Sequence, residues 1–184
     1  LEVGCGTGAL WSQNRDRVST GWRVVLGDLS AGMVRDARRL LDEPAGRCLW
    51  LALDAPCLPF AAGSFDLVLA NHMLYHVAER GRAIRELRRV LRDTGTLVAA
   101  TNGERHLASL LELAARFAPA LGAAPPLART GFSLDNGRQQ LLQAFGRVER
   151  RDFEDALVVT EAGPLADYLC SMEHCRSISG RRDE

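Results

Sequence analysis

Glycines occupy every second position of the segment Gly4–Gly8, directly after a short apolar run. Glycine permits the tight turn that joins a strand to a helix, and it lets a ligand lie directly against the backbone. With Ala9, the segment also satisfies the dinucleotide fingerprint G-x-G-x-x-[GA]. The pattern therefore predicts a nucleotide-type site and leaves the cofactor open. A tight turn that binds no ligand is the plainer alternative.

A carboxylate follows the next apolar run at the distance expected for such a site. Asp28 ends the segment Val25–Asp28, about 20 residues after the glycines, where a carboxylate can accept the hydroxyl protons of a ribose. The alternative is that Asp28 caps the following helix, but Ser30 is available for that role. We expect Asp28 to hold a ribose, which fits NAD and other adenosine ligands equally.

Two histidines and a tyrosine lie within the segment Asn71–Val77. His72, Tyr75 and His76 follow a predicted strand, at the carboxyl edge where ligands of parallel sheets bind. Each could act as a general base toward a protonated acceptor. The alternative for each histidine is a capping or packing role.

Neither of two histidine-containing groups fits a metal site. His72 and His76 have the spacing of two ligands on one helix, but no Glu follows His72 as in H-E-x-x-H. Cys170, His174 and Cys175 lack a fourth ligand. We expect no metal.

These residues need a scaffold, and short apolar runs alternating with amphipathic segments predict β-α units with a parallel sheet. The first five predicted strands are Leu1–Val3, Arg23–Leu26, Leu49–Leu53, Asp66–Ala70 and Thr96–Thr101. The predicted helices are Ser30–Asp42, Ala78–Arg92, Leu107–Phe117, Asp135–Phe145 and Leu165–Met172. Gly95 is expected to turn the chain into the fifth strand, and Val148–Phe153 and Leu157–Thr160 are expected to close the sheet.

Composition narrows the class of protein. The 184 residues fit one domain, and the 23 basic and 23 acidic residues cancel. A neutral chain offers no general field for nucleic acid, although the arginines of 83–92 could form a local basic face. Five cysteines without a repeated spacing, and no long apolar run, predict a cytoplasmic protein that does not associate with membranes.

Further motifs decide between cofactors. They are Leu53-Asp54-Ala55, Leu58-Pro59-Phe60, Ser64-Phe65-Asp66-Leu67-Val68, the His-bearing Asn71–Val77 and Arg89-Val90-Leu91 before Gly95. On these residues the chain resembles the class I S-adenosylmethionine-dependent methyltransferases of the small-molecule type over Leu1–Thr101. Asp93 and Thr94 depart from the Pro and Gly usual in the last turn.

The resemblance implies an α/β fold: a Rossmann-like, doubly wound, mostly parallel seven-stranded sheet with helices on both faces and an antiparallel last strand. We expect a single methyltransferase domain over 1–175, with a cofactor-binding half at 1–101, a substrate-covering insertion at 102–134 and a sheet-closing half at 135–175. Residues 176–184 would form a frayed tail. Leu1 is not an initiator Met, so we expect the helices that precede the first strand in this family to be missing.

The resemblance also implies roles for individual residues. Glu2, Gly4, Cys5 and Gly6 would surround the methionine portion of the cofactor, and Asp28 would hold its ribose. Leu29 and Met33 would flank the adenine, whose exocyclic amine would donate to Asp54 beside the Ala55 backbone. Asn71 would offer its carbonyl near the amino acid end. The alternative for Asp54 is a turn-forming role.

The function implied is methyl transfer from S-adenosyl-L-methionine to a small-molecule acceptor, at oxygen, nitrogen or carbon. Positioning supplies much of the catalysis in such a reaction. An NAD-dependent oxidoreductase is the first alternative, but a chain without Lys has no Tyr-x-x-x-Lys pair. A non-catalytic domain that binds S-adenosylmethionine or another adenosine ligand is the second.

Overall fold

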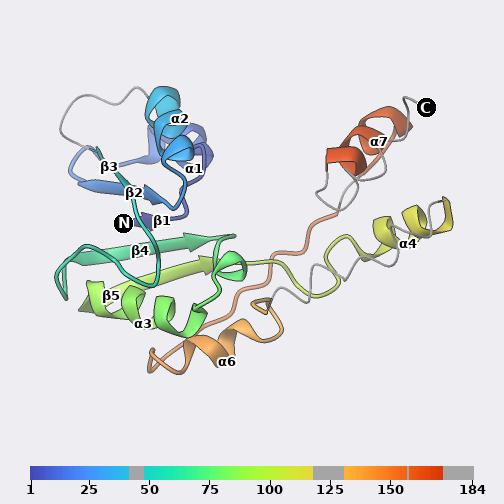
Figure 1. Ribbon diagram of the computed structural model, residues 1–184. Coiled ribbons are helices and arrows are strands. Elements are labelled where there is room, and N and C mark those ends of the chain that lie inside the picture. Colours follow the sequence, from blue (N-terminus) through green and yellow to red (C-terminus); the bar gives the residue numbers. More distant parts are fainter. Residues whose placement is uncertain (42–47, 118–130, 157, 172–184) are drawn as a thin grey trace. The chain divides into compact units, whose positions relative to one another are not determined.

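The computed structural model describes residues 1–41, 48–117, 131–156 and 158–171. The chain divides into two compact units, one made of residues 1–103 and 130–149 and the other of 104–129 and 150–184. The first unit contains the sheet and every residue predicted for the cofactor or for catalysis (Figure 1). A single domain over 1–175 stays a prediction, and the expected tail at 176–184 lies outside the described residues.

The first unit is built on a parallel five-stranded sheet in the order β3-β2-β1-β4-β5. Its strands are β1 Glu2–Val3, β2 Val24–Asp28, β3 Cys48–Ala52, β4 Phe65–Asn71 and β5 Leu91–Ala100. The strand order reverses at β1, which pairs with β2 on one side and β4 on the other. In parallel sheets of this kind, ligands bind at the carboxyl edge beside such a reversal.

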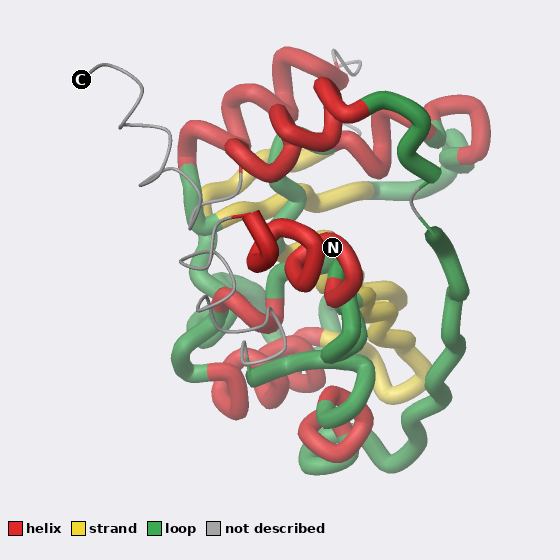
Figure 2. The backbone as a smooth tube through the Cα atoms, turned by 90° about the vertical axis from the view of Figure 1, so that its right-hand side faces the viewer, coloured by secondary structure: helices red, strands yellow, loops and turns green. Residues whose placement is uncertain are grey.

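Helices cover both faces of this sheet. On one face, α1 Ala9–Gln13 and α2 Ala31–Leu41 cover a cluster that includes Cys5 and Leu26. On the other, α3 Arg80–Val90 and the segment around α6 Gly137–Leu141 close a larger core. Helices and strands alternate along most of this unit, and Figure 2 draws the helices in red and the strands in yellow. The doubly wound α/β prediction is therefore confirmed for this unit.

The second unit contains α4 Ala108–Phe117 and α7 Ala162–Ser171. The α4 helix begins one residue after its predicted start, and α7 begins three residues before its predicted start. The α4 helix falls in the expected insertion 102–134, of which residues 118–130 are outside the described part of the chain. Among the helices that the structure describes, none is long and apolar enough to cross a membrane.

The predicted boundary between α3 and β5 is wrong. The helix ends at Val90 instead of Arg92, and β5 begins at Leu91, four residues before Gly95. Leu91 is buried and pairs with Phe65, whereas the next pair joins Leu67 to Thr96, so residues 92–95 bulge out of the ladder. Burial of the Leu91 side chain explains why the strand begins so early.

The sheet-closing strands are not confirmed. Residues 148–153 contain no strand, and neither do 158–160, while residue 157 is outside the described chain. Phe153 is 89% exposed, and Arg150 pairs locally with Asp152 at 2.6 Å. A segment this charged gains little from lying in a sheet. The predicted helix Asp135–Phe145 is also shorter than expected, because α6 begins after Asn136 and ends at Leu141.

Candidate active site

The glycine turn after β1 is fastened to the neighbouring strand. The backbone N–H groups of Gly4 and Cys5 both donate to the Gly27 carbonyl, at 2.8 and 3.0 Å. Gly4, Gly6 and Gly8 have φ of 77°, 54° and 78°, a left-handed conformation that costs a side-chain-bearing residue energy. This segment requires its glycines, as the sequence predicts.

Asp28 connects this turn to the start of α2. Its Oδ2 accepts a hydrogen bond from the Gly6 N–H at 2.9 Å, and its Oδ1 accepts one from the Ser30 N–H at 2.9 Å. Ser30 caps the helix as predicted, since its Oγ accepts from the Met33 N–H at 3.3 Å. A carboxylate can accept about four hydrogen bonds, so these two leave acceptor sites for ribose hydroxyls.

Glu2 is 3% exposed and lies at the centre of a polar group beneath the turn. Its carboxylate accepts from Trp11 Nε1 at 2.6 Å and from Asn71 Nδ2 at 3.5 Å. Burial raises the pKa of Glu2 above its usual value, and the two hydrogen bonds act in the opposite direction. The Asn71 amide nitrogen faces Glu2, which leaves its carbonyl oxygen for another donor. Trp11 is a member of this group that the sequence did not predict.

The thiol of Cys5 is buried. Burial raises its pKa to about 12, and the Sγ donates to the Gly6 carbonyl at 3.6 Å. A thiol is nucleophilic as the thiolate, so Cys5 stays protonated at neutral pH. Its position in the turn leaves the backbone as the part that can meet a ligand.

Two apolar side chains lie open beside Asp28. Leu29 is 74% exposed and Met33 is 43% exposed. A Cβ built on Gly6 would have no atom within 4 Å, so there is open space above the turn. Apolar surface, open space and a carboxylate together fit an adenosine-type cofactor.

The loop after β3 lies next to Asp28. The Leu53 N–H donates to the Asp28 carbonyl at 3.0 Å, which fixes the start of this loop against the end of β2. Asp54 is exposed, and the following Ala55 is buried in the core. The Cys57 N–H donates to the Asp54 carbonyl at 3.0 Å. Asp54 therefore forms a turn through its backbone while its side chain stays open to solvent.

The three candidate bases follow β4. His72 has φ of 52°, and its N–H donates to the Ala100 carbonyl at 2.9 Å. The rings of Tyr75 and His76 lie 4.5 Å apart, and burial raises the pKa of Tyr75. Both histidines are exposed. A non-glycine residue in the left-handed region is a strained position of the kind that often occurs at functional sites.

The histidines are not arranged as a metal site. Tyr75 and His76 belong to a short 3₁₀ turn, Leu74–His76, whereas His72 precedes it, so the two histidines do not share an α-helical face. Within residues 1–41, 48–117, 131–156 and 158–171, no group of three or more His, Cys, Asp or Glu could hold a metal. His174, Cys175 and the Cys170 side chain lie outside the described part of the chain.

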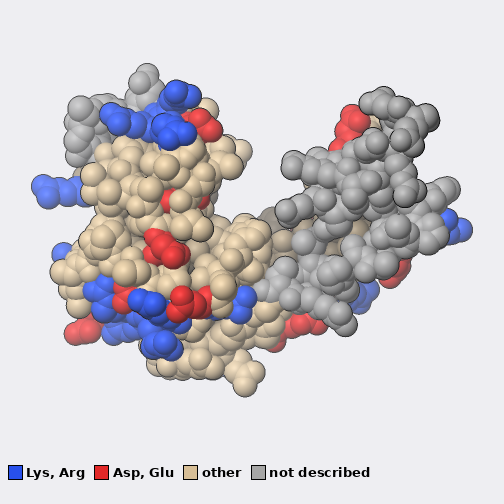
Figure 3. All heavy atoms as spheres, viewed as in Figure 1, with Lys and Arg blue, Asp and Glu red and all other residues tan. Residues whose placement is uncertain are grey.

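Three arginines of the expected basic face over 83–92 are paired with acids. Arg88, Arg89 and Arg92 pair with Asp93, Glu86 and Asp66. In Figure 3, basic and acidic side chains lie intermixed over this part of the surface. These acids reduce the positive charge that this face would present to a nucleic acid.

The strand order, the glycine turn and the acid at the end of β2 define a Rossmann-like α/β protein. Residues 1–99 match the family described as "Methyltransferase domain". The chain therefore belongs to the methyltransferase domain family, among the class I S-adenosylmethionine-dependent methyltransferases. This membership removes the reason to consider an NAD-dependent oxidoreductase.

Two curated relatives and one solved structure illustrate the similarity. The chain is 37% identical to a malonyl-[acyl-carrier protein] O-methyltransferase of Geobacter sulfurreducens, over 68% of this chain and 45% of the relative. It is 36% identical to the ubiquinone/menaquinone biosynthesis C-methyltransferase UbiE of Hahella chejuensis, over 53% of this chain and 40% of the relative. The chain thus spans less than half of either relative.

The fold resembles that of a SAM-dependent methyltransferase from Aquifex aeolicus, with a TM-score of 0.58 and 18% identity. The alignment covers 78% of this chain and 69% of the other.

Proposed function

We propose that this chain is an S-adenosylmethionine-dependent methyltransferase that acts on a small-molecule acceptor. The observation that carries the proposal is the Asp28 carboxylate, hydrogen-bonded to the backbone of both Gly6 and Ser30. These bonds hold the Asp28 carboxylate directly beside the glycine turn, where it can accept hydrogen bonds from ribose hydroxyls. Family membership selects S-adenosylmethionine among the adenosine ligands that such a turn could take.

Each end of the cofactor has residues that suit it. Asp28 would accept from the ribose hydroxyls, Leu29 and Met33 would cover the adenine, and Asp54 with the Ala55 backbone would meet its edge. The turn residues Gly4, Cys5 and Gly6 would lie along the methionine portion, near Glu2 and Asn71. Carboxylates suit hydroxyl and amine donors, and exposed apolar side chains suit an aromatic ring.

When bound, S-adenosylmethionine supplies a methyl group on a positively charged sulfur, which is a strong electrophile. The task of the chain is to orient an acceptor toward that group and to exclude competing water. A protonated acceptor also needs a base. His72 and His76 suit this role because both are exposed and histidine is a common general base. Tyr75, whose pKa burial raises, stays protonated and suits hydrogen bonding to the acceptor.

The acceptor atom remains open among oxygen, nitrogen and carbon. One relative is named for O-methylation and the other for C-methylation. The pairing of Arg88, Arg89 and Arg92 with acids favours a small molecule over a nucleic acid. We also propose a cytoplasmic location, which suits the free thiols of Cys5 and Cys57.

Calorimetric titration of the chain with S-adenosylhomocysteine, in parallel with NADH, tests the cofactor without requiring a known acceptor. We expect micromolar or tighter binding of S-adenosylhomocysteine and no binding of NADH. Binding of NADH alone, or of neither compound, would contradict the proposal. Methyl transfer is then assayed with candidate small-molecule acceptors and, as the protein-bound case, with malonyl-[acyl-carrier protein], for which one relative is named. A chain that binds the cofactor and methylates no acceptor would fit the binding-domain alternative.

A further inference from the structure

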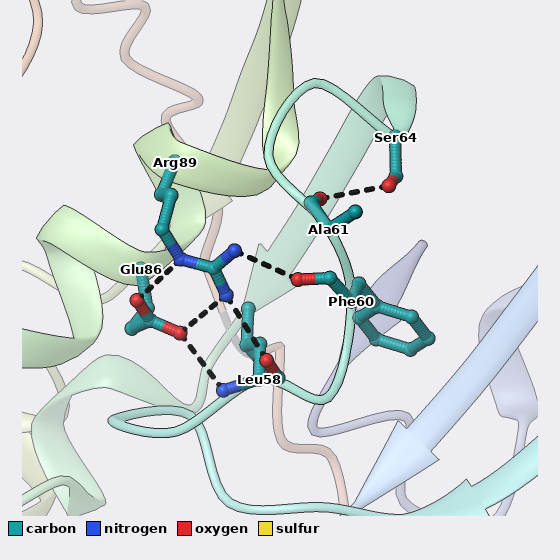
Figure 4. Close-up of polar contacts among 6 residues, drawn as sticks. All are labelled: Leu58, Phe60, Ala61, Ser64, Glu86 and Arg89. Carbon is teal, nitrogen blue, oxygen red and sulfur yellow. Dashed lines mark hydrogen bonds and ion pairs between the residues drawn. The ribbon is translucent and has the colours of Figure 1, made fainter.

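Arg89 on α3 reaches across to the loop that follows β3 (Figure 4). Its Nη1 donates to the Phe60 carbonyl at 2.7 Å, and its Nη2 donates to the Leu58 carbonyl at 3.0 Å. The same guanidinium binds Glu86 with two parallel bonds, from Nε at 2.6 Å and Nη2 at 2.8 Å. One side chain thus connects a helix to two carbonyls about 30 positions earlier in the chain.

Glu86 completes the attachment. Its Oε2 accepts a hydrogen bond from the Leu58 N–H at 3.0 Å, so Leu58 is held at both its N–H and its carbonyl. The hydrogen bond from Arg89 is the largest cause that lowers the pKa of Glu86, which keeps the carboxylate ionised. Charge-assisted bonds of this kind are stronger than neutral ones. We call Glu86 and Arg89 the loop clamp.

The loop clamp holds the far end of a short segment. At the near end, the Leu53 N–H is bonded to the Asp28 carbonyl. Between these two attachments lie residues 54–57, closed by a bridge between Asp54 and Cys57. A segment this short, fixed at both ends, has few conformations left. Asp54 and Ala55 are therefore presented by a preorganised loop.

We infer that Glu86 and Arg89 are positioning residues for the adenine end of the cofactor site. They act through the 54–58 loop, without touching the ligand. The inference rests on the proposed function, because it concerns the same cofactor. It adds two residues from a helix that contributes no ligand contact of its own to the proposed site.

The chemistry of the clamp requires arginine. A guanidinium offers five N–H donors in a planar fork, whereas a lysine ammonium is a compact point charge. Lys at position 89 would keep the charge beside Glu86 and lose the simultaneous contact with both loop carbonyls. Arg88 provides a matched control, since it lies next to Arg89 but binds the Leu91 carbonyl and Asp93.

The experiment compares two ligands that differ only at the adenine edge, S-adenosylhomocysteine and S-inosylhomocysteine. Replacing the exocyclic amine by a carbonyl removes the N–H donor from which Asp54 would accept and places an acceptor there. It also turns the neighbouring ring nitrogen N1 from an acceptor into an N–H donor, which would face the Ala55 backbone N–H in place of an acceptor. We expect the wild type to prefer the adenosyl compound by about 10- to 100-fold, the range of one charge-assisted hydrogen bond. The measurement is calorimetric titration of each ligand into wild type, Arg89→Lys, Glu86→Gln and Arg88→Lys.

Arg89→Lys should lower this preference by about fivefold or more, because the loop no longer holds Asp54 in place, and it should make the loop more sensitive to proteolysis. Glu86→Gln keeps an oxygen for the Leu58 N–H but loses the charge, so it should also lower the preference for the adenosyl compound, by a smaller factor. This variant serves as the test if Arg89→Lys does not fold. Arg88→Lys should match the wild type.

The outcomes separate the two proposals. A wild type that binds neither ligand would overturn the proposed function. A wild type that discriminates, together with clamp variants that discriminate equally well, would overturn the inference alone. An equal loss of affinity for both ligands would show that the clamp only stabilises the fold, and would also overturn the inference.

Discussion

Gly4 and Met73 are packed so closely that a Cβ on the glycine would lie 2.6 Å from the Cβ of Met73. Met73 directly follows His72 and precedes the 3₁₀ turn that carries Tyr75 and His76. The glycine turn after β1 and the turn after β4 are therefore in direct contact. The Gly4–Met73 contact therefore joins the proposed cofactor side of the site to the side proposed for the methyl acceptor.

Replacing Gly4 by Ala should lower the free energy of unfolding by about 2–4 kcal/mol, from overpacking against Met73 and from a side chain at positive φ. Gly63→Ala is the control, since Gly63 has φ of 67° and no atom within 4 Å of an added Cβ. It should lose about 1 kcal/mol, from backbone strain alone. Urea denaturation followed by circular dichroism measures both, and equal losses would argue against the close contact.

Glu2→Gln should make the protein more stable at neutral pH. Burial raises the pKa of Glu2 above 4.5 in the folded state, so folding favours the protonated form. The wild type accordingly loses stability as pH rises from the unfolded value of 4.5 through the higher folded value. The glutamine has no charge to bury. Its one carbonyl oxygen can keep the 2.6 Å bond from Trp11 and gives up only the 3.5 Å contact with Asn71, so we expect a gain of about 1 kcal/mol at pH 7.

Denaturation at several pH values checks this prediction. The gain should vanish as pH falls below 4.5, where the carboxyl of Glu2 is protonated in both states. The exposed Glu79, which pairs with Arg82 at 3.5 Å, provides the control variant Glu79→Gln. A Glu2→Gln protein that is less stable than the wild type at pH 7 would contradict the account.

His72→Gly separates backbone strain from chemistry. Glycine adopts a φ of 52° without strain, so stability should stay level or rise by up to about 1 kcal/mol. If His72 is the base, methyl transfer to any acceptor of the wild type should slow by about 100-fold or more. Turnover at the wild-type rate would show that His72 is not the base, and His76→Ala would then be the next variant to assay.

Local chemistry explains why much of the site is predictable from sequence. The left-handed turn at Gly4 and Gly6 and the cap at Ser30 depend on residues within a few positions of each other. The position of the glycine turn beside Asp28 follows from the order of strands that β-α units impose. The hydrogen bond between Gly6 and Asp28 confirms that placement.

The parts that sequence reasoning missed depend on contacts between distant segments. The bond from Trp11 to Glu2 and the clamp from Arg89 to Leu58 exist only once helices have packed on the sheet. Glu86 and Arg89 do carry one local signal, an acid and a base three positions apart on a helix. The early start of β5 at Leu91 is a similar case, because its burial depends on pairing with Phe65.

The central claim is that Asp28 holds the ribose of the cofactor, and calorimetric titration of Asp28→Ala with S-adenosylhomocysteine tests it most directly. Asp36→Ala, on the exposed side of α2, is the matched control. We predict that Asp28→Ala binds about 10- to 100-fold more weakly than the wild type, from loss of charge-assisted hydrogen bonds, and that Asp36→Ala binds as the wild type does. A folded Asp28→Ala protein with undiminished affinity would contradict the account.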